Sequence, residues 1–190
     1  TANLLIKPDA IPYIGRNQYV YKDANLWQYT PGKTDRVLVS YYQPKEGNSI
    51  RQLDLLTPMS WDEVAPWAEK PIGRRGDDYV AMKNAKTQAC IDVVKTILPQ
   101  LADSIEANFT STPISYQTYT NTEKGSAYGI QKDFNSPMTT VLTPRTPIPN
   151  LLLTGQNLNL HVILGVSMTS CFTCAEIIGM ETIVESLKTN

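Results

Sequence analysis

The sequence predicts an α+β fold, in which a mostly antiparallel sheet with helices on one side is followed by a carboxy-terminal strand-helix unit. Three observations lead to this prediction. Short turn-forming linkers join strand-like segments in the first third of the chain. A long helical pattern follows over residues 77–98. Near the end, a short apolar run, a polar turn and an uncharged helical stretch succeed one another.

The predicted sheet rests on alternation and on turn chemistry. In one segment Val37, Val39 and Tyr41 alternate with the residues at 38, 40 and 42, so that the two sets would lie on opposite faces of a strand. Pro-Gly-Lys at 31–33 and Pro-Lys-Glu-Gly-Asn at 44–48 have the residues that turns favour. The segments with strand character are 3–7, 19–22, 36–42, 50–56 and 105–109.

Helices are predicted from capping signals and periodicity. Ser60 and Glu63 form a capping box that begins a short helix. The helix at 77–98 ends before Pro99, and Thr112-Pro113 begins another helix. Residues 120–149, rich in Gly, Pro, Ser and Thr, are expected to be mostly loop. The apolar face of the long helix is predicted to hold Met82, Ala85, Ala89, Val93 and Ile97.

The bulk composition excludes several classes of partner. A net charge of -1 over 190 residues gives no electrostatic basis for binding nucleic acid. The three cysteines form no disulfide framework, which favours a reducing, cytoplasmic location.

Residues 162–175 are too short for a membrane span and are predicted to be a buried core helix. Because the chain begins at Thr1 and enters a strand at once, we expect it to be a piece of a longer protein.

Polar residues fill the gap between the apolar run at 151–153 and the helix that starts near Val162. They are Thr154, Gln156, Asn157, Asn159 and His161, the one histidine of the chain. The first turn of a helix has free N–H groups and a partial positive charge, so it attracts anionic groups. Two interpretations stay open at this point: a ligand site at the end of a strand, or amides that cap a helix in solvent.

Cys171 and Cys174 form a C-x-x-C pair, which raises the alternative of a thiol oxidoreductase. The pair lies in the middle of the predicted helix, however, and no second pair exists to complete a zinc site. Both residues, and Cys90 in the long helix, are therefore predicted to be small core residues. No metal site is predicted.

Three stretches in order resemble the phytoene desaturase and retinol saturase family of FAD-dependent oxidoreductases. The strongest is PNLLLTGQNLNLHVILGV at 149–166, which resembles the carboxy-terminal flavin-binding phrase of that family. STPISYQTYT at 111–120 resembles a second element, and EKGSAYG at 123–129 a third. Val162 stands where related sequences often have glycine. The similarity is specific over residues 105–180 and looser over 1–104.

The resemblance implies an FAD-binding, Rossmann-like domain whose amino-terminal part is absent, since these residues contain no G-x-G-x-x-G fingerprint. Residues 1–135 would be part of the substrate-binding domain and 136–190 the carboxy-terminal piece of the FAD-binding domain. His161 would lie near the flavin or the substrate. The implied substrate residues are Tyr116, Tyr119 and Tyr128, and the implied cofactor residues are Thr154, Gly155, Gln156, Asn157, Asn159, Leu160, His161, Gly165 and Val166.

The resulting hypothesis is a fragment, inactive alone, of an enzyme that saturates, desaturates or isomerises carbon–carbon double bonds of a polyene or isoprenoid. The flavin would carry the hydride chemistry, with NAD(P)H as one electron donor that the resemblance allows. Its partner would be the missing amino-terminal part of the same polypeptide, and peripheral association with a membrane is also allowed. The alternative is a self-standing module that binds a hydrophobic ligand or a partner on a flavoprotein-derived scaffold.

Overall fold

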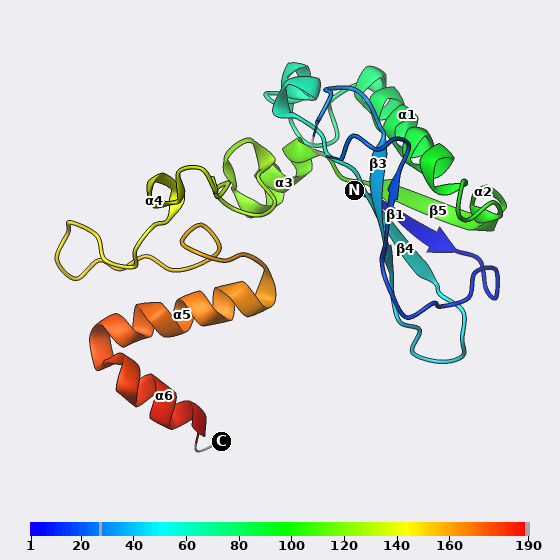
Figure 1. The fold of residues 1–190 in the computed structure, drawn as a ribbon. Coiled ribbons are helices and arrows are strands. Elements are labelled where there is room, and N and C mark those ends of the chain that lie inside the picture. The colour runs from blue at the N-terminus through cyan, green and yellow to red at the C-terminus, as the bar shows by residue number, and fades with distance from the viewer. Residues whose placement is uncertain (27, 189–190) are drawn as a thin grey trace. The chain divides into compact units, whose positions relative to one another are not determined.

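The computed structural model describes residues 1–26 and 28–188, which form two compact units, Thr1–Gly125 and Ser126–Asn190. Figure 1 shows the elements of both units. The predicted division into residues 1–135 and 136–190 concerns the domains of a whole enzyme, so it stays a prediction. Residues 189 and 190 of the second piece lie outside the described residues.

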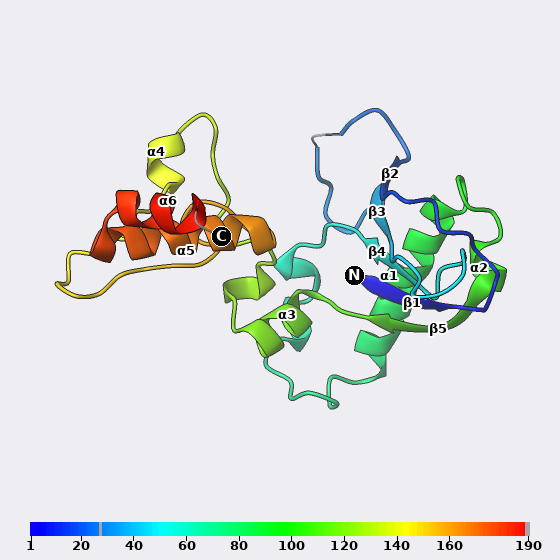
Figure 2. The same cartoon turned by 90° about the horizontal axis from the view of Figure 1, so that it is seen from below.

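The first unit contains a five-stranded sheet in the order β2-β3-β4-β1-β5. All four neighbouring pairs are antiparallel, which confirms the predicted antiparallel sheet. The first strand of the chain is therefore interior, between β4 and β5 (Figures 1 and 2). The strands are β1 (Ala2–Ile6), β2 (Gln18–Tyr21), β3 (Arg36–Tyr41), β4 (Gln52–Leu56) and β5 (Ile105–Thr110).

Helix α1 (Asp77–Val94) covers one face of this sheet (Figure 1). The alternation read from the sequence is confirmed, since Val37, Val39 and Tyr41 are buried while their neighbours on β3 are half-buried. Burying such apolar faces against one another is the main favourable term in forming a two-layer core. Cys90, Ile91, Val93 and Val94 of α1 complete this core.

Two details of α1 differ from the prediction. The helix ends at Val94 instead of Leu98, and residues 95–97 form a turn before the proline. The predicted apolar face is also wrong in part, because Ala85 and Ile97 are exposed. The buried face instead includes Tyr79, Thr87 and Cys90. Alanine is small enough to occur on either face of a helix, so its spacing says little about burial.

A smaller apolar cluster joins α1 to the segments before and after it. Its buried members are Val64, Tyr79 and Ile114. The predicted short helix is two 3-10 turns, η1 (Trp61–Glu63) and η2 (Ala65–Trp67), with a proline at the start of η2. The predicted helix start at Thr112-Pro113 is confirmed by α3 (Pro113–Thr120). The buried hydroxyls of Tyr79 and Thr112 share a hydrogen bond of 2.7 Å that ties α3 to α1.

The remaining elements are short, apart from two helices in the second unit. Residues 120–149 are mostly loop, as predicted, and include η3 (Glu123–Gly125) and the single turn α4 (Pro137–Thr140). The second unit ends with α5 (Val162–Ile178) and α6 (Met180–Lys188). Helix α2 (Leu101–Ser104) of the first unit and α6 were not predicted from the sequence.

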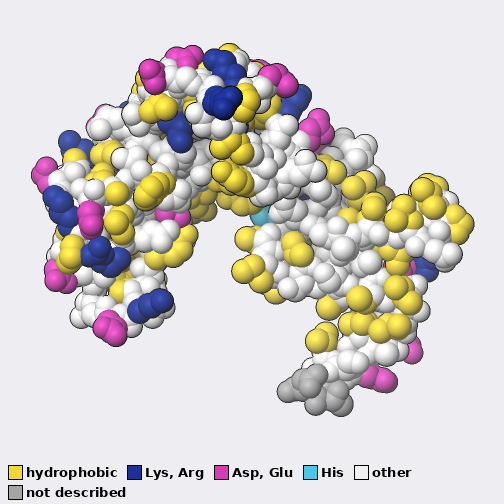
Figure 3. All heavy atoms as spheres, turned by 180° about the vertical axis from the view of Figure 1, so that it is seen from behind, with side chains coloured by type: hydrophobic (Ala, Val, Ile, Leu, Met, Phe, Trp, Pro, Cys, Tyr) yellow, Lys and Arg dark blue, Asp and Glu magenta, His cyan; other side chains and the backbone are white. Residues whose placement is uncertain are grey.

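The predicted strand-helix unit is only partly formed. Residues 151–153 make one isolated bridge, between Arg145 and Leu152, instead of a strand in a sheet. Leu151 and Leu153 are exposed, and this segment lies in no sheet among the described residues of the unit. Helix α5 is present but not buried: Ile163 is 86% exposed and Leu164 74%. The prediction of a buried core helix is therefore wrong for this chain, and Figure 3 shows the hydrophobic side chains at the surface.

Candidate functional site

The candidate site is the turn at residues 154–161, between the bridged segment and α5. Gly155 has a φ of +100°, a conformation that favours glycine, and the space where a side chain would begin is open. Leu158 is 2% exposed and anchors the turn, while Thr154 and His161 are exposed. The turn is thus fixed at one point and presents backbone and polar side chains to its surroundings.

Tyr128 and His161 lie side by side, although 33 positions separate them in the sequence. Their ring centroids are 5.3 Å apart and the rings are tilted by 57°. Such a tilted arrangement is a favourable one for two aromatic rings. The structure therefore brings a tyrosine predicted to contact substrate next to the histidine predicted to lie near the flavin.

The amides of the turn are used in different ways. The Oδ1 atom of Asn157 accepts a hydrogen bond of 3.1 Å from the backbone N–H of Ile130. Gln156 and Asn159 are half-buried, and Asn159 also lines a hollow between the turn and α5. One amide oxygen thus holds the turn in place, whereas no side-chain hydrogen bond from the described residues caps α5, so the helix-capping alternative is not seen for these amides.

The start of α5 has an unusual backbone. His161 is the N-cap in an extended conformation, and Val162 follows with a φ of +63°. Further along, a Cβ atom added at Gly165 would lie 2.6 Å from the Cβ of Leu160. Two of the predicted cofactor residues, Leu160 and Gly165, therefore pack against each other.

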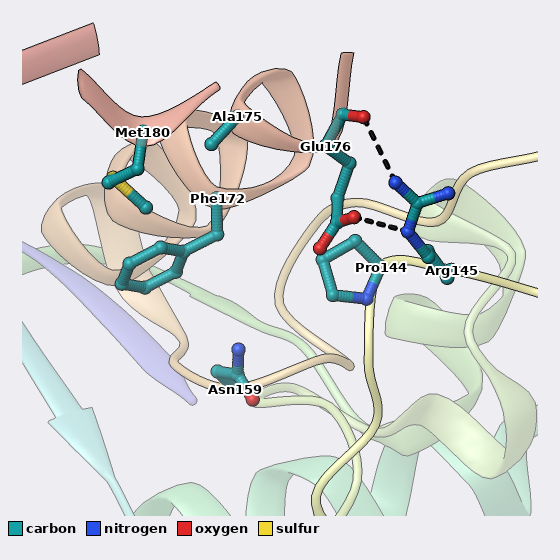
Figure 4. Close-up of a pocket in the computed structure, with 7 residues that line it drawn as sticks. All are labelled: Pro144, Arg145, Asn159, Phe172, Ala175, Glu176 and Met180. Atoms are coloured by element: carbon teal, nitrogen blue, oxygen red, sulfur yellow. Dashed lines mark hydrogen bonds and ion pairs between the residues drawn. The ribbon is translucent and has the colours of Figure 1, made fainter. Parts of the chain in front are cut away.

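A hollow of about 440 Å³ lies beside the turn (Figure 4). Phe172 and Met180 contribute apolar side chains from α5 and α6, and Asn159 and Arg145 come from the loops. The guanidinium of Arg145 pairs with the carboxylate of Glu176 and donates to its backbone carbonyl at 3.2 Å. Of the nine predicted cofactor residues, only Asn159 lines this hollow.

The other two predicted substrate residues belong to the first unit. The Tyr116 hydroxyl shares a hydrogen bond of 2.7 Å with the hydroxyl of Thr1, the residue just before β1. Tyr119 is 76% exposed at the end of α3. Their role toward a substrate stays a prediction.

The cysteines behave differently from one another. Cys90 is buried, and burial raises the pKa of its thiol to about 11, which makes it unreactive at neutral pH. Cys171 is half-buried and Cys174 exposed, so the prediction that both are core residues is wrong for Cys174 in this chain.

Within residues 1–26 and 28–188, no cluster of three or more His, Cys, Asp or Glu side chains could hold a metal ion. The described helices include none that is long and apolar enough to cross a membrane.

The sequence is similar to a class of retinoid-reducing oxidoreductases. The relatives are the all-trans-retinol 13,14-reductases: that of Rattus norvegicus is 33% identical over 109 residues, which is 56% of this chain and 18% of the relative. The Homo sapiens protein is 29% identical over 70% of this chain and 22% of its own length. The Danio rerio protein is 29% identical over 83% of this chain and 23% of its own length. The predicted resemblance to retinol saturase is therefore confirmed at the level of sequence.

The chain spans about a fifth of the length of the curated relatives that it matches. No family model matches the chain, and no solved structure matches it.

Proposed function

We propose that the chain is the carboxy-terminal portion of an FAD-dependent oxidoreductase that acts on carbon–carbon double bonds of a polyene or isoprenoid. The observation that carries the proposal is the similarity to all-trans-retinol 13,14-reductases over up to 83% of the chain. In each of these relatives the matched region is about a fifth of the protein. The whole enzyme would therefore supply the rest of the cofactor site and of the substrate site.

The residues of the turn fit a flavin. Gly155 is left-handed with open space beside it, so a flat ring could approach the backbone closely. The exposed side chains of Thr154 and His161 offer both donors and acceptors. Helix α5 has 17 residues, and the N–H groups of its first turn lack partners within the helix, which suits an anion or an electron-rich ring edge.

The roles of the site residues follow from their exposure and contacts. Thr154, Gly155, Gln156 and the start of α5 would bind the cofactor, which supplies hydride transfer when bound. Leu160, Gly165 and Val166 would act through packing, since Leu160 and Gly165 are in contact. Tyr128 and His161 would orient the flavin or the polyene with their paired rings. No acid–base pair is assigned, because the flavin carries the chemistry.

Two features of the second unit support the proposal that it is incomplete alone. Residues 151–153 have strand character but form a single bridge, and an apolar segment of this kind is stable when paired in a sheet. Helix α5 is apolar around most of its surface, as in helices that are buried on all sides. Both features fit a strand and a helix whose neighbours belong to the amino-terminal, Rossmann-like part of an FAD-binding domain.

The test is an absorption spectrum of the protein translated from the complete reading frame, before and after addition of NAD(P)H. We expect a flavin spectrum, and bleaching by NAD(P)H would identify a reductase with that electron donor. The 190-residue chain with added FAD should show no turnover of a retinoid. A colourless protein that stays colourless with FAD would overturn the proposal and favour the hydrophobic-ligand or partner-binding module.

The cellular location is part of the same proposal. A cytoplasmic enzyme that takes an isoprenoid substrate would work at or near a membrane surface, since such substrates partition into lipid. Fractionation of cells that express the complete reading frame would test this, with release by high salt separating peripheral association from insertion.

A further inference from the structure

Lys132 binds the backbone of the candidate turn, although it lies in a loop with no recognisable motif. Its Nζ atom donates to three backbone carbonyl oxygens, those of Thr140 at 2.6 Å, Asn157 at 3.1 Å and Leu158 at 2.6 Å. A lysine ammonium has three N–H donors, so these contacts use all of them. One side chain thus joins the turn to α4.

Two further contacts bring the segment before Lys132 against the same turn. The N–H of Ile130 donates to the side chain of Asn157 at 3.1 Å. Gly129 has a φ of +79°, and a Cβ atom there would lie 2.8 Å from the carbonyl oxygen of Gln156. The backbone at 129–132 therefore lies too close to the turn for any larger residue than glycine at position 129.

The chemistry of the contact requires a positive charge. Carbonyl oxygens carry partial negative charge and repel one another where three point at one place, and an ammonium with three N–H donors offsets this repulsion better than a neutral donor. The ammonium group is compact and its donors diverge, whereas the planar guanidinium of arginine presents its donors in a fixed fork. Neither methionine nor arginine would therefore reproduce the three contacts of Lys132.

We infer that Lys132 is a positioning residue of the candidate flavin turn. It acts through the carbonyl groups of Asn157 and Leu158, which lie in the middle of the turn, between Gln156 and Asn159. The inference rests on the proposed function in so far as the turn is a flavin site. The inference has a structural half, that Lys132 fixes the turn, and a functional half, that this affects the flavin. The structural half does not depend on the proposed function.

The structural half is tested by amide hydrogen exchange on the full chain, comparing Lys132→Met, Lys132→Arg and the control Lys188→Met in the last turn of α6. The N–H of Leu142 donates to the carbonyl of Leu158 at 3.4 Å, so both it and Ile130 report on the turn. In Lys132→Met we expect exchange at Ile130 and Leu142 to be about tenfold faster, the effect of losing charge-assisted hydrogen bonds. Lys132→Arg should restore only part of the protection, and Lys188→Met should behave as wild type. Unchanged protection in Lys132→Met overturns the inference, provided that Val39 of β3 shows the first unit to be folded.

The functional half is tested on the protein from the complete reading frame. We expect Lys132→Met to weaken FAD binding by about tenfold and to change the absorption bands and the reduction potential of the bound flavin. A loss of turn protection with unchanged flavin affinity and spectrum would overturn the positioning role. If no variant binds flavin but the exchange result holds, the proposed function fails while the anchoring of the turn by Lys132 stands.

Discussion

Val162 is a β-branched residue in the left-handed region, with a φ of +63° at the first position of α5. A β-branched side chain is rarely found there, because its Cβ substituents crowd the neighbouring backbone. The resemblance noted in the sequence implies that related proteins often have glycine at this position. The structure supplies a physical reason: the backbone at the start of α5 has the conformation that glycine adopts without strain.

Replacing Val162 with glycine should therefore stabilise the second unit. We expect a gain of about 1 kcal/mol, since relief of left-handed strain exceeds the entropic cost of glycine. The measurement is urea unfolding followed by helical circular dichroism. Val166→Gly, inside the same helix, serves as the control and should lose about 1 kcal/mol. A loss of similar size at both positions would show that Val162 is not strained.

Gly165 shows the opposite case, in which the absence of a side chain permits a close contact. A Cβ atom at this position would lie 2.6 Å from the Leu160 side chain and 2.8 Å from its backbone carbon. Gly165→Ala should cost about 1–3 kcal/mol by overpacking, although alanine is the better helix former. The exposed Ser167→Ala in the same helix is the matched control and should change stability by less than about 0.5 kcal/mol.

Among the elements, η1 and α1 are joined by a charged contact. Lys86 of α1 approaches the carboxylate of Glu63 to 2.9 Å, and both side chains are mostly buried. The same carboxylate accepts hydrogen bonds from the Tyr29 hydroxyl and, at 2.9 Å, from the N–H of Ser60. Burial alone would raise the pKa of Glu63, but these hydrogen bonds and Lys86 lower it to about 2.

This pKa predicts how the stability of the first unit depends on pH. A carboxyl group with a folded pKa of about 2 and an ordinary value of 4.5 stabilises the fold above pH 4.5. That contribution, on the order of 2 kcal/mol, is lost as the pH falls from 4.5 toward 2. Urea unfolding across this range should show the loss, and Glu63→Gln should flatten it. An equal slope in the variant would assign the acid sensitivity to other groups.

The sheet was predictable because alternating burial and turn residues are local signals. The strand around Val39 is found where its alternation indicated, and the strand around Leu53 where the preceding turn indicated. Residues 151–153 were not, since an apolar run has strand character in any context but becomes a strand only beside a partner. The paired rings of Tyr128 and His161 join two motifs that the sequence identified separately. Lys132 was missed, because a lysine in a loop follows no pattern that predicts its partners.

At the scale of the whole molecule, the exposed surface of α5 is the feature that most needs a partner. Ile163 and Leu164 are largely exposed, and covering each side chain would contribute about 1.5–3 kcal/mol. In the 190-residue chain this apolar surface would promote self-association, so a dimer of the chain alone would not establish the state of a whole enzyme.

The double variant Ile163→Lys, Leu164→Gln tests what covers α5. In the 190-residue chain it should lower the binding of an apolar dye and change stability by less than about 0.5 kcal/mol. In the protein from the complete reading frame it should lower the midpoint of thermal unfolding and weaken flavin retention, because charge would enter a buried interface. Val80→Lys on the exposed side of α1 is the control for both proteins. Equal tolerance in both would mean that α5 stays exposed in the larger protein.

The interior position of β1 also determines the order in which the strands pair while the chain is being synthesised. Its neighbours along the sheet are β4 and β5, and Ala2 pairs with Thr110, more than a hundred positions away in the sequence. The meander β2-β3-β4 closes through connections of 14 and 10 residues. The β1–β5 ladder requires a much larger loop to close and forms more slowly. A nascent chain that has not yet reached Thr110 would therefore hold β1 with one edge unpaired. During that interval the unpaired edge of β1 is open to chaperones, and pulse-labelled exchange would detect its late protection.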